Sequence, residues 1–403
     1  MYFVFGRDYR SKLIEELSQS VNIIAAEDVN AKLSRLDKES VEKIYASHEE
    51  AVEAIKAKLP QSDLKNAITL FRDKETLRKS LAGLFPQYHF EAVKIKDIGS
   101  LKLNFHNGQK KYIIKPVKGF FSIGVRVIDE HTDLKKLQQN IYEEMHNQKS
   151  IHPHYFKNDA LSKKDFLVEE FVGEGISKLG DFKQNAEIAI DGFYNANGQF
   201  TVVGIYHHPF SKHSQFFHLL YYTNAEIFKF FVHKIMDFFN QLPELSKLNL
   251  KNFPLHAEFS WWNNTLFPIE VNPLRFGGMG LGDTIYYATG INPYFAFFNN
   301  YNINWDDIWL NNHDSFAWVL GYKSTKHPCQ FNEAYHLNFM HKLNSHLIQY
   351  QPIEKDEDVF SIAYLKSNNP DDFQQILEID FDQLALDSIA PKKPTKKFTL
   401  KPN

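Results

Sequence analysis

Two strand-like runs separated by only three polar residues constrain the fold of this chain most strongly. The runs "LHAEFSWW" and "LFPIEVNP" flank the tripeptide "NNT" at 263–265. Asparagine tolerates the left-handed backbone that short hairpin loops need, so we expect an antiparallel hairpin. A three-residue loop would place Trp262 opposite Leu266 and Glu258 opposite Glu270.

The polar residues of this hairpin predict a cation site. Strand side chains alternate with a period of two, so Glu270 and Asn272 share a face. Glu258 would join them, and two carboxylates opposite each other in a sheet repel unless a cation lies between them. A few hard oxygen ligands suit Mg²⁺. The alternative is that Glu258 faces solvent and Asn272 only caps a turn, and these residues alone leave both interpretations open.

The segment after the hairpin combines an arginine with a glycine-rich loop. Arg275 is followed by "FGGMGLGD", whose glycines allow the backbone to approach an anion closely. Asp283 is placed to cap a helix over "TIYYATG", so that the helix start would face anionic substrate. The simpler alternative is that these glycines only turn the chain, and the residues before them favour a binding role.

A second candidate element is "YIIKPVKGFFSIG". Lys115 ends an apolar strand here and is followed by Gly119, Ser122 and Gly124. A lysine in this position either extends to the surface or reaches phosphate oxygens, and the loop could add backbone N–H groups.

The third element, "VEEFVG" at 168–173, is a strand whose end could offer N–H and C=O groups to an adenine edge. Glu169 or Glu170 could then bind an exocyclic amine or a ribose hydroxyl. Consecutive glutamates also occur on solvated faces, so this element is weak evidence by itself.

Composition excludes several classes of protein. A chain of 403 residues is too long for one ordinary core, so two or three packed units are expected. Its net charge of −3 gives no basic surplus for nucleic acid or anionic lipid. The single cysteine, Cys329, excludes a disulfide framework and fits a reducing cytoplasm. No signal peptide is read, and no apolar run reaches the roughly 20 residues of a membrane helix.

The pattern along the chain predicts four parts. Residues 1–68 read as a small α/β unit: a strand, a helix over "SKLIEELSQS", a strand over "VNIIAA", and one helix from 38 to Pro60. Residues 69–300 form the central module, with lobes of about 69–168 and 169–300. Within it we expect a helix capped by Asp73, and a long helix whose capping box is Thr223 with Glu226. Residues 301–387 form a C-terminal α/β extension, and 388–403 a flexible basic tail.

The order of these elements resembles the ATP-grasp superfamily of carboxylate–amine and related ligases. The resemblance covers roughly residues 70–293 and is most specific in "IEVNPLRFGG". It implies a mixed α and β fold in which two α+β lobes clasp the nucleotide, preceded by the small N-terminal domain.

The resemblance also implies roles for individual residues. Lys74 and Lys115 would bind the nucleotide, Arg275 would stabilise charge on the transferring phosphoryl group and the tetrahedral intermediate, and Glu187 would contact the nucleotide, with Glu174 as a rival ribose ligand. The remaining implied positions are a flap over the phosphates with Gly119, Ser122 and Gly124, an adenine hinge of Glu169, Glu170, Phe171 and Val172, and the metal ligands Glu258, Glu270 and Asn272.

The implied activity is an ATP-dependent ligase that activates a carboxylate as an acyl phosphate and couples it to an amine, with Mg²⁺ or Mn²⁺ as the metal. The alternatives are a phosphotransferase on the same fold and a nucleotide-binding module without chemistry. Substrates would be small molecules. Homodimers are common in the family, but no interface pattern indicates one. Four histidines between 205 and 223 suggest an aromatic acceptor pocket or plain core packing more than a metal site: His207, His208, His213 and His218.

Overall fold

The computed structural model describes most of the chain, and all structural statements below concern these residues. They are 1–5, 11–25, 28, 43–59, 61–86, 88–106, 108, 110–118, 124–151, 165–172, 179–210, 219–324, 333–343, 346–353 and 359–389. Gly119, Ser122 and Glu174, three of the positions singled out above, lie outside them, as do His213, His218 and residues 390–403 of the predicted tail.

The N-terminal unit is built on a three-stranded parallel sheet with the order β2-β1-β3. Its elements are β1 (Tyr2–Phe5), η1 (Lys12–Leu17), β2 (Asn22–Ala25), β3 (Ile44–Ala46), α2 (Glu49–Lys58) and α3 (Asp63–Phe71). The single helix predicted from 38 to Pro60 is wrong. Ile44–Ala46 pairs with β1 as a fully buried strand, and α2 begins only after His48, whose extended backbone precedes the helix.

The second unit is a four-stranded antiparallel sheet with the order β4-β7-β5-β6. It comprises α4 (Lys74–Leu81), β4 (Phe90–Lys94), η4 (Ile95–Ser100), β5 (Tyr112–Pro116), β6 (Arg126–Ile128), α5 (Leu134–Ile151) and β7 (Asp165–Glu170). Ile141 of α5 packs with Ile114 and Val168 in the core of this unit. Asp73 caps α4, as predicted, by accepting a hydrogen bond from the Thr76 N–H.

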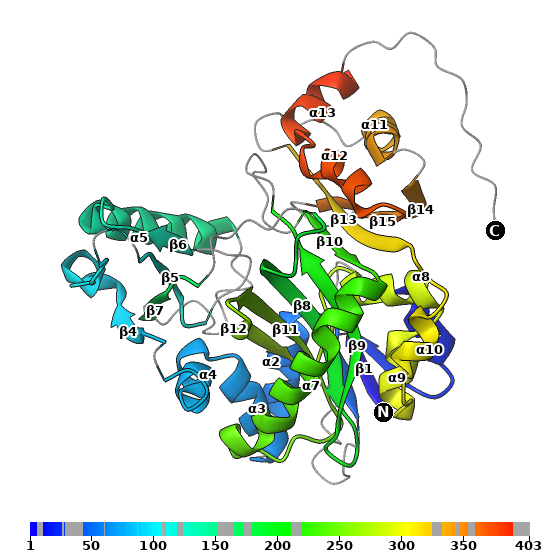
Figure 1. The fold of residues 1–403 in the computed structure, drawn as a ribbon, viewed down its shortest axis with the longest axis horizontal. Helices are drawn as coiled ribbons and strands as arrows, with labels where there is room; N and C mark the ends of the chain where they lie inside the picture. The colour runs from blue at the N-terminus through cyan, green and yellow to red at the C-terminus, as the bar shows by residue number, and fades with distance from the viewer. Residues whose placement is uncertain are drawn as a thin grey trace.

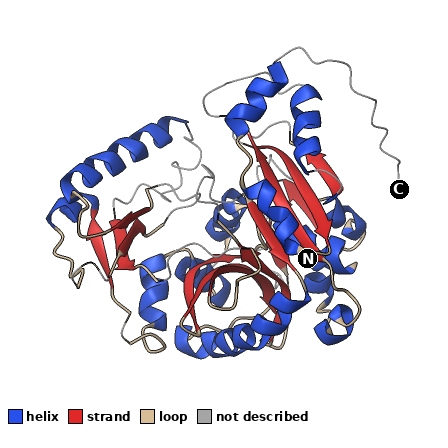
Figure 2. Ribbon diagram, turned by 45° about the horizontal axis from the view of Figure 1, so that its top comes forward, coloured by secondary structure: helices blue, strands red, loops and turns tan. Residues whose placement is uncertain are grey.

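The third unit is an eight-stranded sheet with the order β12-β11-β8-β9-β10-β13-β15-β14. Its strands are β8 (Asn185–Tyr194), β9 (Phe200–His208), β10 (Leu220–Thr223), β11 (Phe253–Trp262), β12 (Thr265–Pro273), β13 (Ser315–Tyr322), β14 (Leu347–Pro352) and β15 (Val359–Ser367). Figure 2 shows the smaller four-stranded sheet and its helix set to one side of this larger layer.

Helices cover the large sheet and fill the connections between its strands. They are α7 (Ala225–Ser246), η5 (Leu281–Asp283), α8 (Thr284–Thr289), α9 (Pro293–Asn299), α10 (Trp305–Trp309), α11 (Glu333–Leu343), η7 (Pro370–Phe373), α12 (Gln374–Leu377) and α13 (Phe381–Ile389). The predicted capping box of α7 is wrong: Asn224, not Thr223, is the N-cap, and its side chain accepts from the Ile227 N–H.

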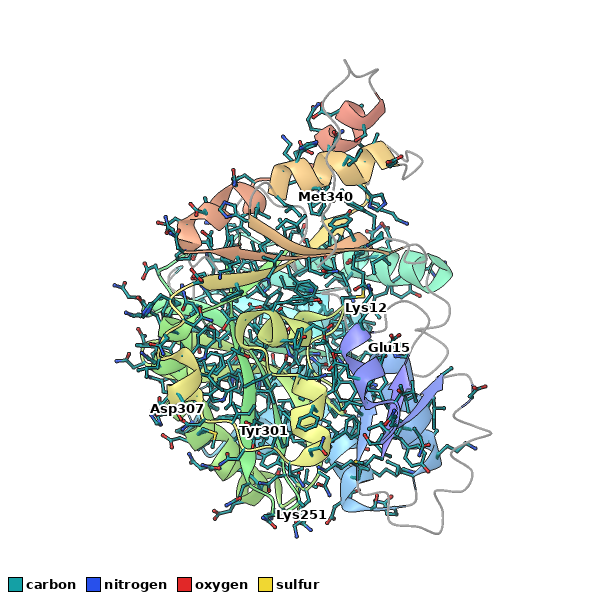
Figure 3. All side chains as sticks on the ribbon, turned by 90° about the vertical axis from the view of Figure 1, so that its right-hand side faces the viewer. Lys12, Glu15, Lys251, Tyr301, Asp307 and Met340 are labelled. Carbon is teal, nitrogen blue, oxygen red and sulfur yellow. The ribbon has the colours of Figure 1, made fainter. Side chains whose placement is uncertain are left out.

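The C-terminal strands continue the sheet of the central module and do not form a sheet of their own. β13 pairs with β10 over four residues, and β15 and β14 follow in the same layer. The side view shows α11, which carries Met340, at the opposite end of the molecule from Lys251 (Figure 3). No described helix combines the length and apolar character needed to cross a membrane.

Candidate functional site

The hairpin β11–β12 brings Glu258 and Glu270 together by a route that differs from the predicted one. The loop has two residues, Asn263 and Asn264, both with positive φ, so the three-residue loop is wrong. A loop shorter by one residue would by itself pair Glu258 with Ile269 and not with Glu270. A β-bulge at Ile269 adds the missing residue and restores Glu258 to a position directly opposite Glu270.

The three predicted metal ligands therefore share one face of the sheet. Glu258 lies opposite Glu270, and the Asn272 amide donates to Glu270 Oε1 at 2.9 Å. Glu270 also forms an ion pair with Lys74, whose Nζ lies 2.9 Å from Oε2. Burial would raise the pKa of the Glu270 carboxyl, but Lys74 and the Asn272 amide hold it well below its usual range.

Glu187, the first acidic residue of β8, borders this group. Its Oε1 and His208 Nδ1 form a hydrogen bond of 2.8 Å. Burial raises the pKa of the Glu187 carboxyl, His208 opposes this shift, and the charges of Glu258 and Glu270 add to it. This acidic surface, with an amide beside it, is a donor set of the kind that hard divalent cations prefer.

The oxygen chemistry of the donor set thus fits Mg²⁺, with an incomplete shell. Glu258, Glu270 and Asn272 supply two carboxylates and one amide. Within the described ranges, no group of three or more histidine, cysteine, aspartate or glutamate side chains is arranged to hold a metal. A magnesium ion here would need water or phosphate oxygens for its remaining positions, which is usual for that ion.

Lys115 lies at the end of β5 and is buried against Glu169 of β7. Glu169 also accepts from Arg78 Nε at 2.7 Å and Nη2 at 3.2 Å. Burial would raise the pKa of the Glu169 carboxyl, but Arg78 and Lys115 lower it to about 2. Burial lowers the pKa of Lys115 to about 8, although the Glu169 charge opposes this shift.

Arg78, which the sequence did not single out, contacts two parts of the candidate site. It lies one turn after Lys74 on α4, so both side chains leave the same face of that helix. Its Nη2 also donates to the carbonyl of the bulged residue Ile269 at 3.0 Å. The sequence signal that could have indicated Arg78 is a second cationic residue, four positions after Lys74, in a helix capped by Asp73.

Four further described residues were predicted as parts of the adenine hinge and the flap, and their contacts are local: Glu170, Phe171, Val172 and Gly124. Glu170 pairs with Lys110 at 2.9 Å, and the Phe171 N–H donates to the Lys111 carbonyl. The Val172 carbonyl accepts from Ser260 Oγ of β11, which links the end of the predicted hinge to the large sheet. Gly124 has φ +74, a conformation that suits glycine.

Arg275 is directed toward the N-terminal unit. Its Nε lies 3.0 Å from Glu49 Oε1 at the start of α2. Leu274, fully buried with φ +62, turns the chain just before it, and the Leu274 carbonyl accepts from the Ala46 N–H. The N-terminal unit therefore fixes both the backbone and the side chain of this segment.

A buried polar chain that the sequence reasoning also missed fixes the glycine-rich loop. Asp191 Oδ1 accepts from the Gly277 N–H at 2.7 Å and contacts His256 Nδ1 at 2.8 Å. His256 Nε2 lies 3.4 Å from Glu258 Oε1. Despite burial, the hydrogen bonds and charges of Asp191 and Glu258 raise the pKa of His256 to about 9. The Gly277 N–H is thus already engaged by the protein.

The C-terminal strands hold the same loop from the other side. Trp318 Nε1 of β13 donates to the Met279 carbonyl at 2.8 Å, and the Tyr364 hydroxyl of β15 donates to the Gly280 carbonyl at 2.9 Å.

The predicted capping role of Asp283 is wrong. Its side chain makes no cap hydrogen bond to α8 and accepts instead from Ser11 and Tyr294 hydroxyls.

Comparison with known proteins defines the class. The model of the ATP-grasp domain family matches residues 109–283. The L-amino acid ligase from Bacillus licheniformis has a similar structure, with a TM-score of 0.59 and 13% identity over 95% of this chain and 96% of that one. The chain therefore has the ATP-grasp fold, and its residues 109–283 match the ATP-grasp domain family. The predicted fold class and the predicted resemblance to this family are confirmed.

Two further solved structures show the same fold. The N5-carboxyaminoimidazole synthetase from Staphylococcus aureus, complexed with ADP, gives a TM-score of 0.57 and 13% identity over 94% of this chain and 96% of that one. The biotin carboxylase domain of the 2-oxoglutarate carboxylase from Hydrogenobacter thermophilus, in complex with MgADP, gives 0.54 and 11% over 91% and 86%. No curated protein sequence matches the chain.

Proposed function

We propose that the protein is an ATP-dependent ligase that activates a small carboxylate as an acyl phosphate and couples it to an amine. The observation that carries the proposal is the register of the β11–β12 hairpin. It places Glu258 opposite Glu270, with Asn272 on the same face and Lys74 at 2.9 Å from Glu270. A cationic side chain thus lies beside carboxylate and amide oxygens, and this grouping supports a site for nucleotide and metal here.

The nucleotide would be bound by residues of both lobes. Lys74 and Lys115 would supply positive charge for phosphate oxygens, and the predicted flap with Gly119, Ser122 and Gly124 would supply backbone N–H groups. The hinge residues Glu169, Glu170, Phe171 and Val172 would lie along the adenine edge, and Glu187 beside the ribose and phosphates. The buried pairs of Glu169 with Arg78 and Lys115 would orient the hinge for this contact.

The metal would be held by Glu258, Glu270 and Asn272. Bound there with phosphate oxygens, Mg²⁺ or Mn²⁺ would neutralise charge that develops during phosphoryl transfer. His256, held by Asp191, orients the Glu258 carboxylate through its contact at 3.4 Å.

Two covalent steps would follow. A carboxylate oxygen of the acid attacks the γ-phosphorus of ATP, the bond to the β-phosphate oxygen breaks, and ADP leaves. The amine nitrogen then attacks the acyl carbon, phosphate leaves, and the amine loses one proton as the amide forms. Arg275 would stabilise the negative charge of the tetrahedral intermediate, and Glu49 would position its guanidinium.

The structural neighbours support this choice of reaction. They include an L-amino acid ligase and a biotin carboxylase domain complexed with MgADP and bicarbonate. At identities of 11–13%, these likenesses show the fold alone. The acid and the amine are therefore to be identified by assay.

The test is ADP release from Mg-ATP across a panel of carboxylates, with and without amines. ADP release that requires both an acid and an amine would support ligation. ADP release with an acid alone, and no amide product, would favour a phosphotransferase. Nucleotide binding without turnover for any pair would favour a module without chemistry.

Glu270→Gln tests the site itself. We expect loss of Mg-ATP turnover with the fold retained, because the amide removes one anionic metal ligand. The control is Glu143→Gln, an exposed position on α5 far from the hairpin in sequence. Unchanged turnover in Glu270→Gln would contradict the metal assignment.

A further inference from the structure

Helix α4 carries two buried cations one turn apart that reach carboxylates on different sheets. Lys74 pairs with Glu270 on β12 of the large sheet, at 2.9 Å. Arg78 pairs with Glu169 on β7 of the small sheet, at 2.7 Å. In Figure 1, α4 lies between the small sheet and β12, as these contacts require. The Lys74 backbone N–H also donates to the Val117 carbonyl, which ties the start of the helix to the small sheet.

The ion pair between Lys74 and Glu270 joins two residues that would need different partners once ligands bind. The side chains of Lys74 and Glu270 are only 11% and 24% exposed, so little solvent screens them. A divalent cation bound to Glu270 would lie within a few ångströms of the Lys74 ammonium and would be repelled by it. The same ammonium is attracted by a phosphate group.

Stability alone does not require this pair. Apolar residues of similar volume in place of a buried ion pair are often equally stable or more stable, because the desolvation of both charges offsets their attraction. Glu169 shows the contrasting arrangement: it has two cationic partners, Arg78 and Lys115, so it stays paired when one of them is withdrawn. The carboxylate of Glu270 has Lys74 and the Asn272 amide.

We propose that Lys74 competes with the divalent cation for Glu270 and so makes metal binding depend on nucleotide. In the ligand-free protein Lys74 holds the Glu270 carboxylate. Phosphate oxygens of the nucleotide then take the ammonium, and Glu270 becomes available to the metal that accompanies them. Lys74 is thus a positioning residue that sets the order of binding. The inference rests on the proposed function only in taking a nucleotide as the source of the phosphate.

The test measures Mn²⁺ binding without nucleotide, by the paramagnetic resonance signal of the free ion. We expect weak binding to the wild-type protein and binding about tenfold or more tighter to Lys74→Met, because one positive charge beside the site is removed. Lys74→Gln provides a second variant of similar length, in case the methionine does not fold. The double variant Lys74→Met with Glu270→Gln should lose the gain.

Lys79→Met is the matched control. Lys79 lies on the same helix, exposed and paired with Glu75, so its removal should leave Mn²⁺ affinity unchanged. A non-hydrolysable ATP analogue should then raise the Mn²⁺ affinity of the wild-type protein more than that of Lys74→Met.

The inference is overturned if Lys74→Met and Lys74→Gln both fold and bind Mn²⁺ no more tightly than the wild-type protein. It is equally overturned if the gain survives in the double variant, since the added ion would then be bound elsewhere. Failure of the proposed function looks different: the wild-type protein would bind no nucleotide, while the nucleotide-free Mn²⁺ comparison would still report on Lys74.

Discussion

The buried Glu169 carboxylate, between Arg78 and Lys115, should make the folded protein sensitive to acid. Its pKa is about 2 in the folded protein, against an ordinary value of 4.5. At about 1.4 kcal/mol for each pH unit, this difference corresponds to roughly 3 kcal/mol of folding stability. Because the folded-state pKa is the lower one, the stabilisation is complete above pH 4.5 and is lost as the pH falls toward about 2.

The assay is denaturant-induced unfolding of the wild-type protein and Glu169→Gln from neutral pH down into the acid range. At neutral pH the variant should be less stable by roughly 3–5 kcal/mol, because two buried cations lose their anionic partner. This difference should shrink by roughly 3 kcal/mol as the wild-type carboxylate takes up a proton.

The control is Glu170→Gln, the next residue of the same strand. Its pair with Lys110 is partly exposed, so the unfolding free energy should change by less than about 1 kcal/mol. The reasoning would be refuted if the gap between the wild-type protein and Glu169→Gln stayed constant across the acid range.

Three further changes test local features by the midpoint of denaturant unfolding. Asn264→Ala should cost about 1 kcal/mol, because alanine tolerates the left-handed loop conformation at φ +58 less well; no loss would contradict the two-residue loop. Asn224→Ala should cost about 1 kcal/mol by removing the N-cap of α7, whereas Thr223→Ala should not disturb the cap. Trp318→Phe should cost about 1 kcal/mol by removing the hydrogen bond to the Met279 carbonyl, and an unchanged midpoint would argue that the bond adds no stability.

The parts of the fold that the sequence predicted are those governed by short periods and by element order. The period of two in β12 places Glu270 and Asn272 on one face, and the structure has them hydrogen-bonded. The order of Lys74, Lys115 and the hairpin predicted the resemblance to ATP-grasp proteins and their fold, and both are confirmed. Strand periodicity and the order of elements are properties of the chain itself, so tertiary contacts do not change them.

The hairpin shows what local signals leave out. The loop length was wrong by one residue, yet the predicted pairing of Glu258 with Glu270 is correct because the bulge at Ile269 offsets the error. A bulge has no clear pattern in a single strand, because it depends on what both strands contact. Here the bulged carbonyl accepts from Arg78, a residue 191 positions earlier in the chain.

The other errors have the same physical origin. Ile44–Ala46 fits a helical period, but pairing with β1 buries all three residues as a strand. Asp283 has the right position for a cap, but two hydroxyls from distant segments, Ser11 and Tyr294, bind its carboxylate. Tertiary partners overrode local preference in both cases, and no period in the sequence reports them.

Because the large sheet is continuous, the segment that must fold as one unit extends beyond the segment that matches the family model. The match to the ATP-grasp family model ends at residue 283, but β10 is paired on one side by β13. A protein shortened to end near residue 300 would keep every proposed ligand-binding residue and yet expose the full hydrogen-bonding edge of β10, which invites aggregation. It would also lose Trp318 and Tyr364, which donate hydrogen bonds to the Met279 and Gly280 carbonyls. A domain transplanted by its family boundaries should therefore precipitate or bind poorly, whereas one that extends through β15 should stay monodisperse.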